Sequence, residues 1–330
     1  MIELPEAYVL ASQISGALKG RTVVRVTANA YPHSFAVFSG DPALYHEMLA
    51  GKTIIDARPG AGSTGGSHVE IVCGDMSLII SAPVRYFPPG EKPPQKHQLL
   101  IEFDDMSGLS STIQMWGSIL CVPAAGAYKT GASRQKTAAA PAPASTPAPT
   151  PVDAPATAPV PETAPAPTPV PTSAPAAASI PASAPAPTPL DEAFDALYFS
   201  NLLKNARPSL SVKAFLTTER RIPGLGNGVM HDILFNARIN PKRKIETLSD
   251  YNEERLFHSI KTTLRYMAER GGRNTEKDLF GNQGAYKTIL CGRTYGMPCR
   301  NCGGAITKEA YMGGNIYYCP ECQPMHTNVG

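Results

Sequence analysis

The sequence predicts an α+β protein with an N-terminal antiparallel β-sandwich or barrel and a flanking helix, followed by a helical domain and a β-hairpin zinc ribbon. Three observations predict this class: short β-branched runs in the first part, apolar residues at helical spacing in the last part, and an Ala/Pro-rich tract between them. The expected units are 1–137 (sandwich), 138–190 (linker), 191–290 (helical domain) and 291–330 (zinc ribbon).

The first part opens with a predicted helix. Leu4-Pro5-Glu6 suits a helix start, an apolar stripe follows at helical spacing, and Gly20 ends it. The runs that follow are rich in β-branched residues and are separated by Gly, Asp and Pro, which is typical of strands. The predicted strands are 21–28, 53–57, 68–72, 77–81, 98–103 and 111–115.

The tract 138–190 holds 17 of the 33 prolines and cannot bury a core. Its proline spacing favours an extended polyproline II spacer that reaches at most about 3.1 Å per residue. Two interpretations remain open: a plain insertion between domains that act together, or a segment that docks a partner.

The period becomes helical after the tract. Helices are predicted over 194–205, 212–218, 228–237 and 249–270. Ser249 is a plausible N-cap, with Asp250 and Glu253 in the first turn, and Gly271-Gly272 ends the long helix.

The formal net charge of +3 is unevenly distributed. Residues 1–137 have 11 basic and 11 acidic side chains, whereas residues 191–330 have 19 basic and 14 acidic ones. This excess favours a polyanion such as nucleic acid, although it is also common on proteins that bind none. Without a signal-like start or a long apolar run, the sequence predicts a soluble, cytoplasmic protein with no membrane span.

Four of the seven cysteines form two C-x2-C pairs separated by 16 residues. Two such turns on a hairpin can close a tetrahedral thiolate shell around one structural Zn²⁺; the alternative is disulfides or free thiols. The predicted ligands are Cys299, Cys302, Cys319 and Cys322. The other three, interpreted as small buried hydrophobic residues rather than redox groups, are Cys73, Cys121 and Cys291.

A glycine-rich turn, residues 221–228, lies between two predicted helices. Gly224 and Gly226 would let backbone amides at a helix N-terminus approach a DNA phosphate, and Asn227 can donate a further hydrogen bond. By itself such a turn is more often structural.

The run GLGNGVMHDILFNARINPKRK resembles the helix–two-turn–helix of the formamidopyrimidine-DNA glycosylase and endonuclease VIII family, and the four-cysteine ribbon follows it. The opening Glu3-Leu4-Pro5-Glu6 resembles the family's N-terminal signature. The resemblance is clearest over 208–323 and weak over 20–125. It implies a monomeric DNA repair enzyme, a DNA glycosylase and AP lyase of the class I AP endonuclease type, acting on double-stranded DNA with a damaged or abasic nucleotide.

The resemblance also implies site residues. The family uses the amine of an N-terminal proline as nucleophile, but Ile2 occupies that place here, so the amine belongs to Met1 or Ile2. Glu3 matches the acid and base at the sugar, and Glu6 matches a carboxylate that shapes the site. Without the resemblance, both are ordinary first-turn acids on a helix.

Two further positions depart from the family. No lysine is present in the region 57–66, where Arg58 either contacts phosphate or is a surface charge. The family's ribbon arginine falls at Gly314, with Asn315 and Lys308 as possible substitutes. The alternatives are therefore a catalytically altered DNA-binding or lesion-recognition protein of the same fold, or an unrelated zinc-ribbon protein that acts on RNA or in transcription.

Overall fold

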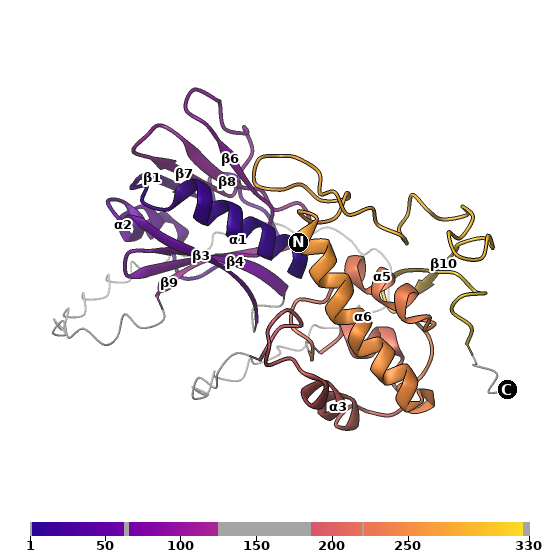
Figure 1. Ribbon diagram of the computed structural model, residues 1–330. Helices are drawn as coiled ribbons and strands as arrows, with labels where there is room; N and C mark the ends of the chain where they lie inside the picture. The colour runs from indigo at the N-terminus through magenta and orange to yellow at the C-terminus, as the bar shows by residue number, and fades with distance from the viewer. Residues whose placement is uncertain (1, 63–65, 125–185, 220, 326–330) are drawn as a thin grey trace, which may run out of the picture. The chain divides into compact units, whose positions relative to one another are not determined.

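The computed structural model describes residues 2–62, 66–124, 186–219 and 221–325. Helix α1 (Leu4–Leu18) opens the chain and packs across strands β3 (Ile54–Gly62) and β4 (Gly66–Cys73), as Figure 1 shows. Pro5 in its first turn and the buried stripe that includes Leu10 and Ile14 explain this placement, because the helix buries one apolar face on the sheet.

Two sheets form the N-terminal sandwich. One has the order β1-β7-β8-β6 and the other β2-β9-β5-β4-β3. The ladders are antiparallel except that β2 pairs with β9 in parallel, so the predicted antiparallel sandwich is confirmed with one exception. The remaining strands are β1 (Val23–Ala28), β2 (Ala36–Phe38), β5 (Met76–Ile80), β6 (Val84–Phe87), β7 (Leu99–Phe103), β8 (Gly108–Ser111) and β9 (Gly117–Pro123).

The predicted strand 111–115 is wrong, because β8 ends at Ser111 and a loop follows. The amide of Ile113 donates to the side-chain oxygen of Gln98 (2.7 Å) instead of to a neighbouring strand, and Met115 in this loop is 81% exposed. Periodicity also missed β2, β6, β9 and the short helix α2 (Tyr45–Leu49), each of which is short or lacks regular alternation.

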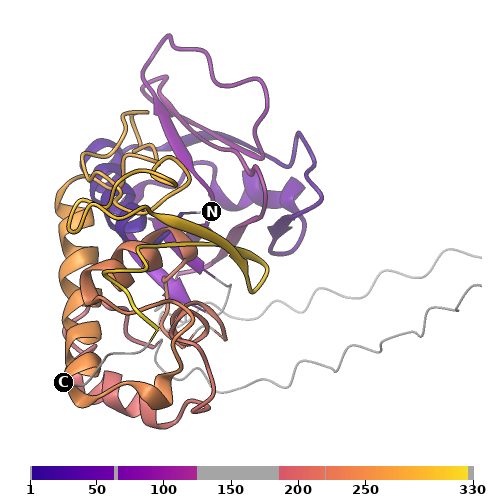
Figure 2. The ribbon, with the colours of Figure 1, turned by 90° about the vertical axis from the view of Figure 1, so that its right-hand side faces the viewer.

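The helical part matches the predicted segments closely. The helices are α3 (Ala196–Lys204), α4 (Val212–Thr217), α5 (Asn227–Ala237) and α6 (Asp250–Glu269). Ser249 caps α6, as predicted, and the structure adds a capping box with Asn252. Strands β10 (Thr307–Tyr311) and β11 (Gly314–Tyr318) form the hairpin of the ribbon, which lies against α5 in Figure 2.

The predicted linker 138–190 lies mostly outside the described residues, but its last residues belong to the folded part. Thr188 and Pro189 are buried, and the amide of Thr188 donates to Asp191 (2.7 Å). Tyr8 of α1 also donates to Asp191 (3.1 Å). The folded C-terminal part therefore begins a few residues before the predicted boundary.

The sandwich and the helical part share their cores. Leu4 of α1 packs in the apolar cluster of the helical part, whereas Leu279 packs in that of the sandwich and its carbonyl accepts the amide of Tyr86 (2.8 Å). The first turn of α1 therefore lies where both parts meet. Among the described residues, none of the helices has the length and apolar character that a membrane span needs.

Candidate functional site

Glu3 lies at the N-cap of α1 but caps a different helix. Its carboxylate accepts the amides of Gly228 (2.9 Å) and Val229 (2.7 Å), the first turn of α5, and makes no cap bond in α1. Unpaired amides and the helix dipole make such an N-terminus a favourable place for a negative charge. The predicted catalytic carboxylate and the predicted phosphate-binding turn are therefore in direct contact.

The glycines of this turn make room for the start of the chain. Gly224 has φ +85°, and its carbonyl accepts the amide of Leu4 (3.2 Å). A Cβ on Gly226 would lie 2.4 Å from the Glu3 carboxylate. The glycine-rich turn thus has a structural role that the sequence interpretation left open, and two of the α5 amides already serve Glu3.

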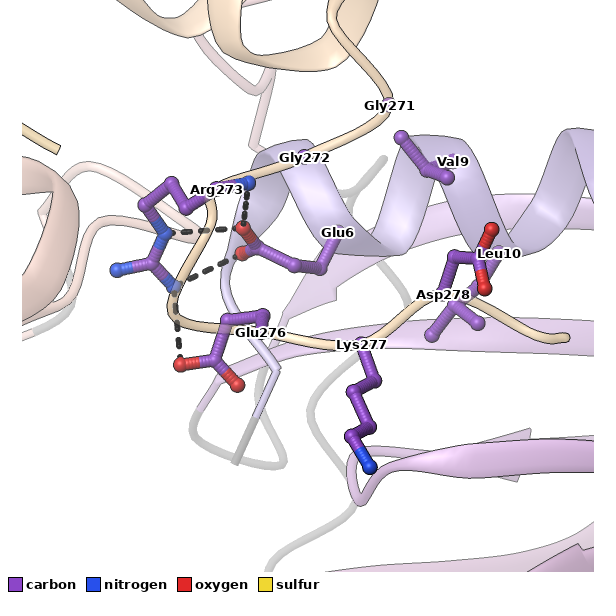
Figure 3. Close-up of a pocket in the computed structure, with 9 residues that line it drawn as sticks. All are labelled: Glu6, Val9, Leu10, Gly271, Gly272, Arg273, Glu276, Lys277 and Asp278. Atoms are coloured by element: carbon purple, nitrogen blue, oxygen red, sulfur yellow. Dashed lines mark hydrogen bonds and ion pairs between the residues drawn. The ribbon is translucent and has the colours of Figure 1, made fainter. Parts of the chain in front are cut away.

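Glu6 and Arg273 form the most buried ion pair of the site (Figure 3). The guanidinium donates from Nε to Oε1 (2.9 Å) and from Nη2 to Oε2 (3.0 Å), and the Arg273 backbone amide adds a third bond to Oε1 (3.2 Å). Arg273 Nη1 also lies 3.3 Å from Glu3, and both Arg273 and Glu6 are 4% exposed at the side chain. Burial by itself would lower the pKa of Arg273, but Glu3 and Glu6 outweigh it and raise that pKa.

A third acid, Glu276, completes the surroundings of Arg273. Its carboxylate lies 3.9 Å from Arg273 Nη2, and burial raises its pKa while Arg273 lowers it. Three acidic side chains therefore surround one guanidinium at the meeting of α1, α5 and the segment after α6.

Ile2 is anchored in the sandwich. Its side chain is 4% exposed within the apolar core, and its nitrogen donates to the carbonyl of Ser81 (3.3 Å). Met1, the other predicted source of the amine, lies outside the described residues.

Asn227, the first residue of α5, lies under the ribbon hairpin together with Lys213 of α4. A Cβ on Gly314 would lie 3.1 Å from the side-chain nitrogen (Nδ2) of Asn227 and 3.9 Å from the Lys213 ammonium. Lys213 is 2% exposed and donates to the carbonyl of Tyr311 (2.6 Å), and burial lowers its pKa. The sequence interpretation missed Lys213, because a lysine on a short helix looks like a surface residue.

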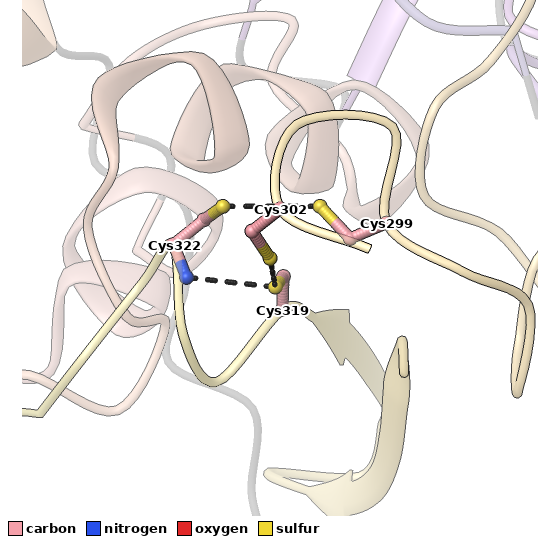
Figure 4. Close-up of side chains that lie close together, drawn as sticks. All are labelled: Cys299, Cys302, Cys319 and Cys322. Atoms are coloured by element: carbon pink, nitrogen blue, oxygen red, sulfur yellow. Dashed lines mark hydrogen bonds between the residues drawn. The ribbon is translucent and has the colours of Figure 1, made fainter. Parts of the chain in front are cut away.

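The four clustered cysteines converge at the base of the hairpin (Figure 4). Their sulfurs lie within 4.8 Å of one another, with Cys302 and Cys319 at 3.4 Å and Cys299 and Cys322 at 3.8 Å. A disulfide would bring two sulfurs to about 2.05 Å, whereas tetrahedral thiolate ligands at about 2.3 Å from an ion lie about 3.8 Å apart. The cluster could therefore hold a metal ion.

The unclustered cysteines fit the apolar interpretation where they are buried. Cys73 and Cys121 lie in the sandwich core, and burial raises the pKa of each thiol to about 11. Such thiols stay protonated and poorly reactive near neutral pH. Cys291 is half-buried.

The model of the formamidopyrimidine-DNA glycosylase H2TH domain matches residues 186–278. The chain's fold is similar to the MutM (Fpg) protein of Thermus thermophilus, with a TM-score of 0.66 and 18% identity over 98% of this chain and 100% of that one. It is similar to the Lactococcus lactis Fpg in a complex with DNA containing an abasic site, with a TM-score of 0.68 and 19% identity over 98% and 99%. The chain therefore contains a formamidopyrimidine-DNA glycosylase H2TH domain and has a fold similar to that of these proteins.

Sequence relatives agree over a smaller region. The formamidopyrimidine-DNA glycosylase of Thermomicrobium roseum is 32% identical over 141 residues, 42% of this chain and 48% of that protein. The one of Rhodopseudomonas palustris is 34% identical over 146 residues, 41% and 48% of the two chains. The match thus spans about half the length of these relatives.

Within the formamidopyrimidine-DNA glycosylase fold, Arg58 lies in strand β3 and not in the turn that follows it. It is opposite Glu70 in the sheet, and its exposed guanidinium pairs with Asp56 (3.3 Å). The predicted phosphate contact therefore competes with an acid that is already beside Arg58. Gly314, by contrast, lies in the hairpin next to the Asn227 side chain, and Asn315 follows Gly314 in the same strand.

Proposed function

We propose that this chain is a DNA repair enzyme, a glycosylase and AP lyase that acts on duplex DNA with a damaged, oxidised or abasic nucleotide. One observation carries the proposal: the Glu3 carboxylate, two residues from the start of the sequence, is bonded to the first turn of α5 directly beside Asn227. A DNA strand that contacts Asn227 would have its sugar near the first residues of the chain.

The proposed reaction uses a backbone amine, of Met1 or, after removal of Met1, of Ile2. An α-amine has a pKa near about 8, so a useful fraction is neutral at neutral pH. Its nitrogen forms a bond to C1′ of the nucleotide as the bond from C1′ to the base breaks, and the base leaves with a proton. The C1′–O4′ bond then opens, O4′ takes a proton, and C1′ is left double-bonded to the nitrogen as a Schiff base. Loss of a proton from C2′ then expels the 3′ phosphate and cuts the strand. Glu3 is proposed as the carboxylate beside the sugar, and Glu6 as a residue that shapes the site.

The proposed DNA contacts combine a hydrogen-bond donor with buried positive charge. Asn227 and Lys213 both lie beside Gly314, the position at which the resemblance expects an arginine. Lys213 as a residue is 2% exposed, so little water competes at its ammonium, which would attract a phosphate more strongly than a surface lysine does. Lys213 is therefore our candidate for the missing positive charge. Arg58 is kept as a weaker candidate because Asp56 pairs with it.

The metal we propose for the cysteine cluster is zinc. Four thiolates fill a tetrahedral shell and leave no open position, so a bound Zn²⁺ would stabilise the hairpin and take no part in the reaction. The hairpin carries Tyr311, whose carbonyl accepts the Lys213 ammonium, and thus it supports the proposed phosphate site.

A second candidate function is lesion or DNA-structure recognition without strand cleavage. It is favoured by Ile2, which replaces the family's proline, is buried in the sandwich core and donates its nitrogen to Ser81. A nitrogen held in this way has to leave its place before it can attack a sugar.

Borohydride trapping on abasic and oxidised-base duplexes separates the two candidates. The enzyme proposal expects a covalent adduct whose tryptic peptide contains the first residue, with intact mass identifying Met1 or Ile2. Acetylation of the α-amine should remove the adduct and leave binding. If the purified protein binds these duplexes but gives no adduct, the recognition function replaces the enzymatic one. Preferential binding of RNA would argue against both.

A further inference from the structure

The position of the Arg273 guanidinium depends on the backbone of Gly228. Its Nη1 atom lies directly over the backbone of Gly228, where an added Cβ would be only 1.8 Å away. No side chain at position 228 can coexist with the guanidinium in this position, because a separation under about 3 Å is a severe clash. The Arg273 guanidinium therefore fits in this position only because residue 228 is a glycine.

The backbone of the segment after α6 places this guanidinium beside the first turn of α1. Gly271 and Gly272 have φ of +70° and +92°, which turns the chain back toward α1. The amide of Tyr286 donates to the Gly272 carbonyl (3.1 Å), and the amide of Asn274 donates to the Tyr286 carbonyl (2.8 Å). Arg273 thus comes from a backbone that is fixed on both sides.

The guanidinium then divides its donors between two carboxylates. Nε and Nη2 bind Glu6 in a bidentate pair, which orients the plane of the group, and Nη1 is left facing Glu3 at 3.3 Å. The Oε2 atom of Glu3 receives Arg273 on one side and the Val229 amide on the other. Glu3 is held between a fixed cation and a helix N-terminus.

We propose that Arg273 is a positioning residue for Glu3. Arg273 is bound to Glu6 and fits beside Gly228. From there it holds the Glu3 carboxylate in the orientation that accepts the amides of Gly228 and Val229. The role of Glu3 at a sugar rests on the function proposed above, but its placement by Arg273 does not. A lysine could not replace Arg273, because a single ammonium cannot bind Glu6 with two parallel bonds and face Glu3 with a third nitrogen.

Gly228→Ala is the sharpest test, since it keeps every charged group and still places a Cβ on the guanidinium. Alanine favours a helix over glycine, so a loss of α5 itself is not expected. Gly16→Ala is the matched control, because Gly16 lies in α1 with open space around its Cβ position. Arg273→Lys is the second variant, which keeps the buried positive charge where Arg273→Met would leave Glu6 unpaired.

Amide hydrogen exchange measured by NMR reports the placement of Glu3 independently of enzymatic activity. Both variants should speed exchange of the Val229 amide about tenfold, because that amide loses its acceptor, and Gly16→Ala should leave it unchanged. The Asn274 amide, bonded to Tyr286, should keep its protection. Unchanged Val229 exchange in both variants, or equal loss at Val229 and Asn274, would overturn the proposal.

Trapping on abasic DNA gives the functional readout. Both variants should lower the rate at saturating DNA by about tenfold, with the Kd for a duplex carrying an unreactive tetrahydrofuran site within about threefold of wild type. Wild-type protein that forms no adduct would refute the proposed enzyme but not the positioning, which the exchange measurement decides separately. A wild-type trapping rate in Gly228→Ala together with fast Val229 exchange would show that Glu3 placement does not matter to the reaction and would overturn the functional half.

Discussion

The carboxylate of Glu6 and the guanidinium of Arg273, 267 positions apart in the sequence, form a bidentate ion pair in which each side chain is only 4% exposed. This pair joins the first helix of the sandwich to the segment that follows the last helix. Because buried charges are costly unless they are paired, each of the two residues requires the other.

Glu6→Gln should destabilise the fold by about 3 kcal/mol, because it leaves the buried Arg273 without its bidentate partner. The free energy of unfolding in urea measures the loss. Glu102→Gln is the control: Glu102 pairs with Arg25 on an exposed part of the sandwich, and its change should cost under about 1 kcal/mol. Equal effects of the two changes would contradict the importance of the buried pair.

His231 should make the protein less stable in acid. Burial, and secondarily Lys213, lowers the pKa of this histidine to about 4, so the unfolded chain binds a proton below about pH 6.5 that the folded chain does not. Stability from this group is complete above about pH 6.5 and falls as the pH drops toward 4. Between pH 7.5 and 5.0 wild type should lose about 2 kcal/mol more than His231→Phe does, measured by urea unfolding at each pH.

Asp232 acts in the opposite direction, since burial raises its pKa to about 6, but it is present in both proteins and leaves the difference to His231. His258→Phe is the control because His258 is exposed, and it should keep the wild-type pH dependence. A wild-type pH dependence in His231→Phe would refute the assignment.

The cysteine cluster should bind one zinc ion per chain, measured by elemental analysis of the purified protein. Cys319→Ser should abolish this stoichiometry and weaken duplex binding at least about tenfold, because the hairpin beside Asn227 and Lys213 loses its anchor. Cys291→Ser, outside the cluster, should keep both zinc and binding. Wild-type protein without metal but with full DNA affinity would rule out this role.

Asn227→Ala and Lys213→Met should each weaken binding to a tetrahydrofuran-containing duplex by about tenfold, whereas Glu3→Gln should change it little. Lys213→Met should also lower the slope of log Kd against log salt by about one, because one phosphate contact is lost. The exposed Lys204 on α3 supplies the control change, Lys204→Met. Normal affinity and salt dependence in both test variants would move the DNA contact elsewhere.

The parts of this protein that sequence predicted are those with local causes. The C-x2-C pairs bring two thiolates together within one turn, and helical periodicity predicted α1, α3, α4, α5 and α6 within a few residues. Strands were predicted less well, because a strand such as β9 depends on its pairing with distant strands. The predicted strand 111–115 is wrong because Ile113 bonds to a side chain and not to a neighbouring strand.

By itself, the sequence determined the α+β class, the helical segments and the positions of the four clustered cysteines, through patterns that need only short-range geometry. Only the tertiary structure decided what surrounds Glu3. Arg273 and Lys213 look like ordinary surface bases in the sequence, and nothing local relates Gly228 to a residue 45 positions later. Their roles depend on burial and on contacts between distant segments, which exist only after the chain has packed.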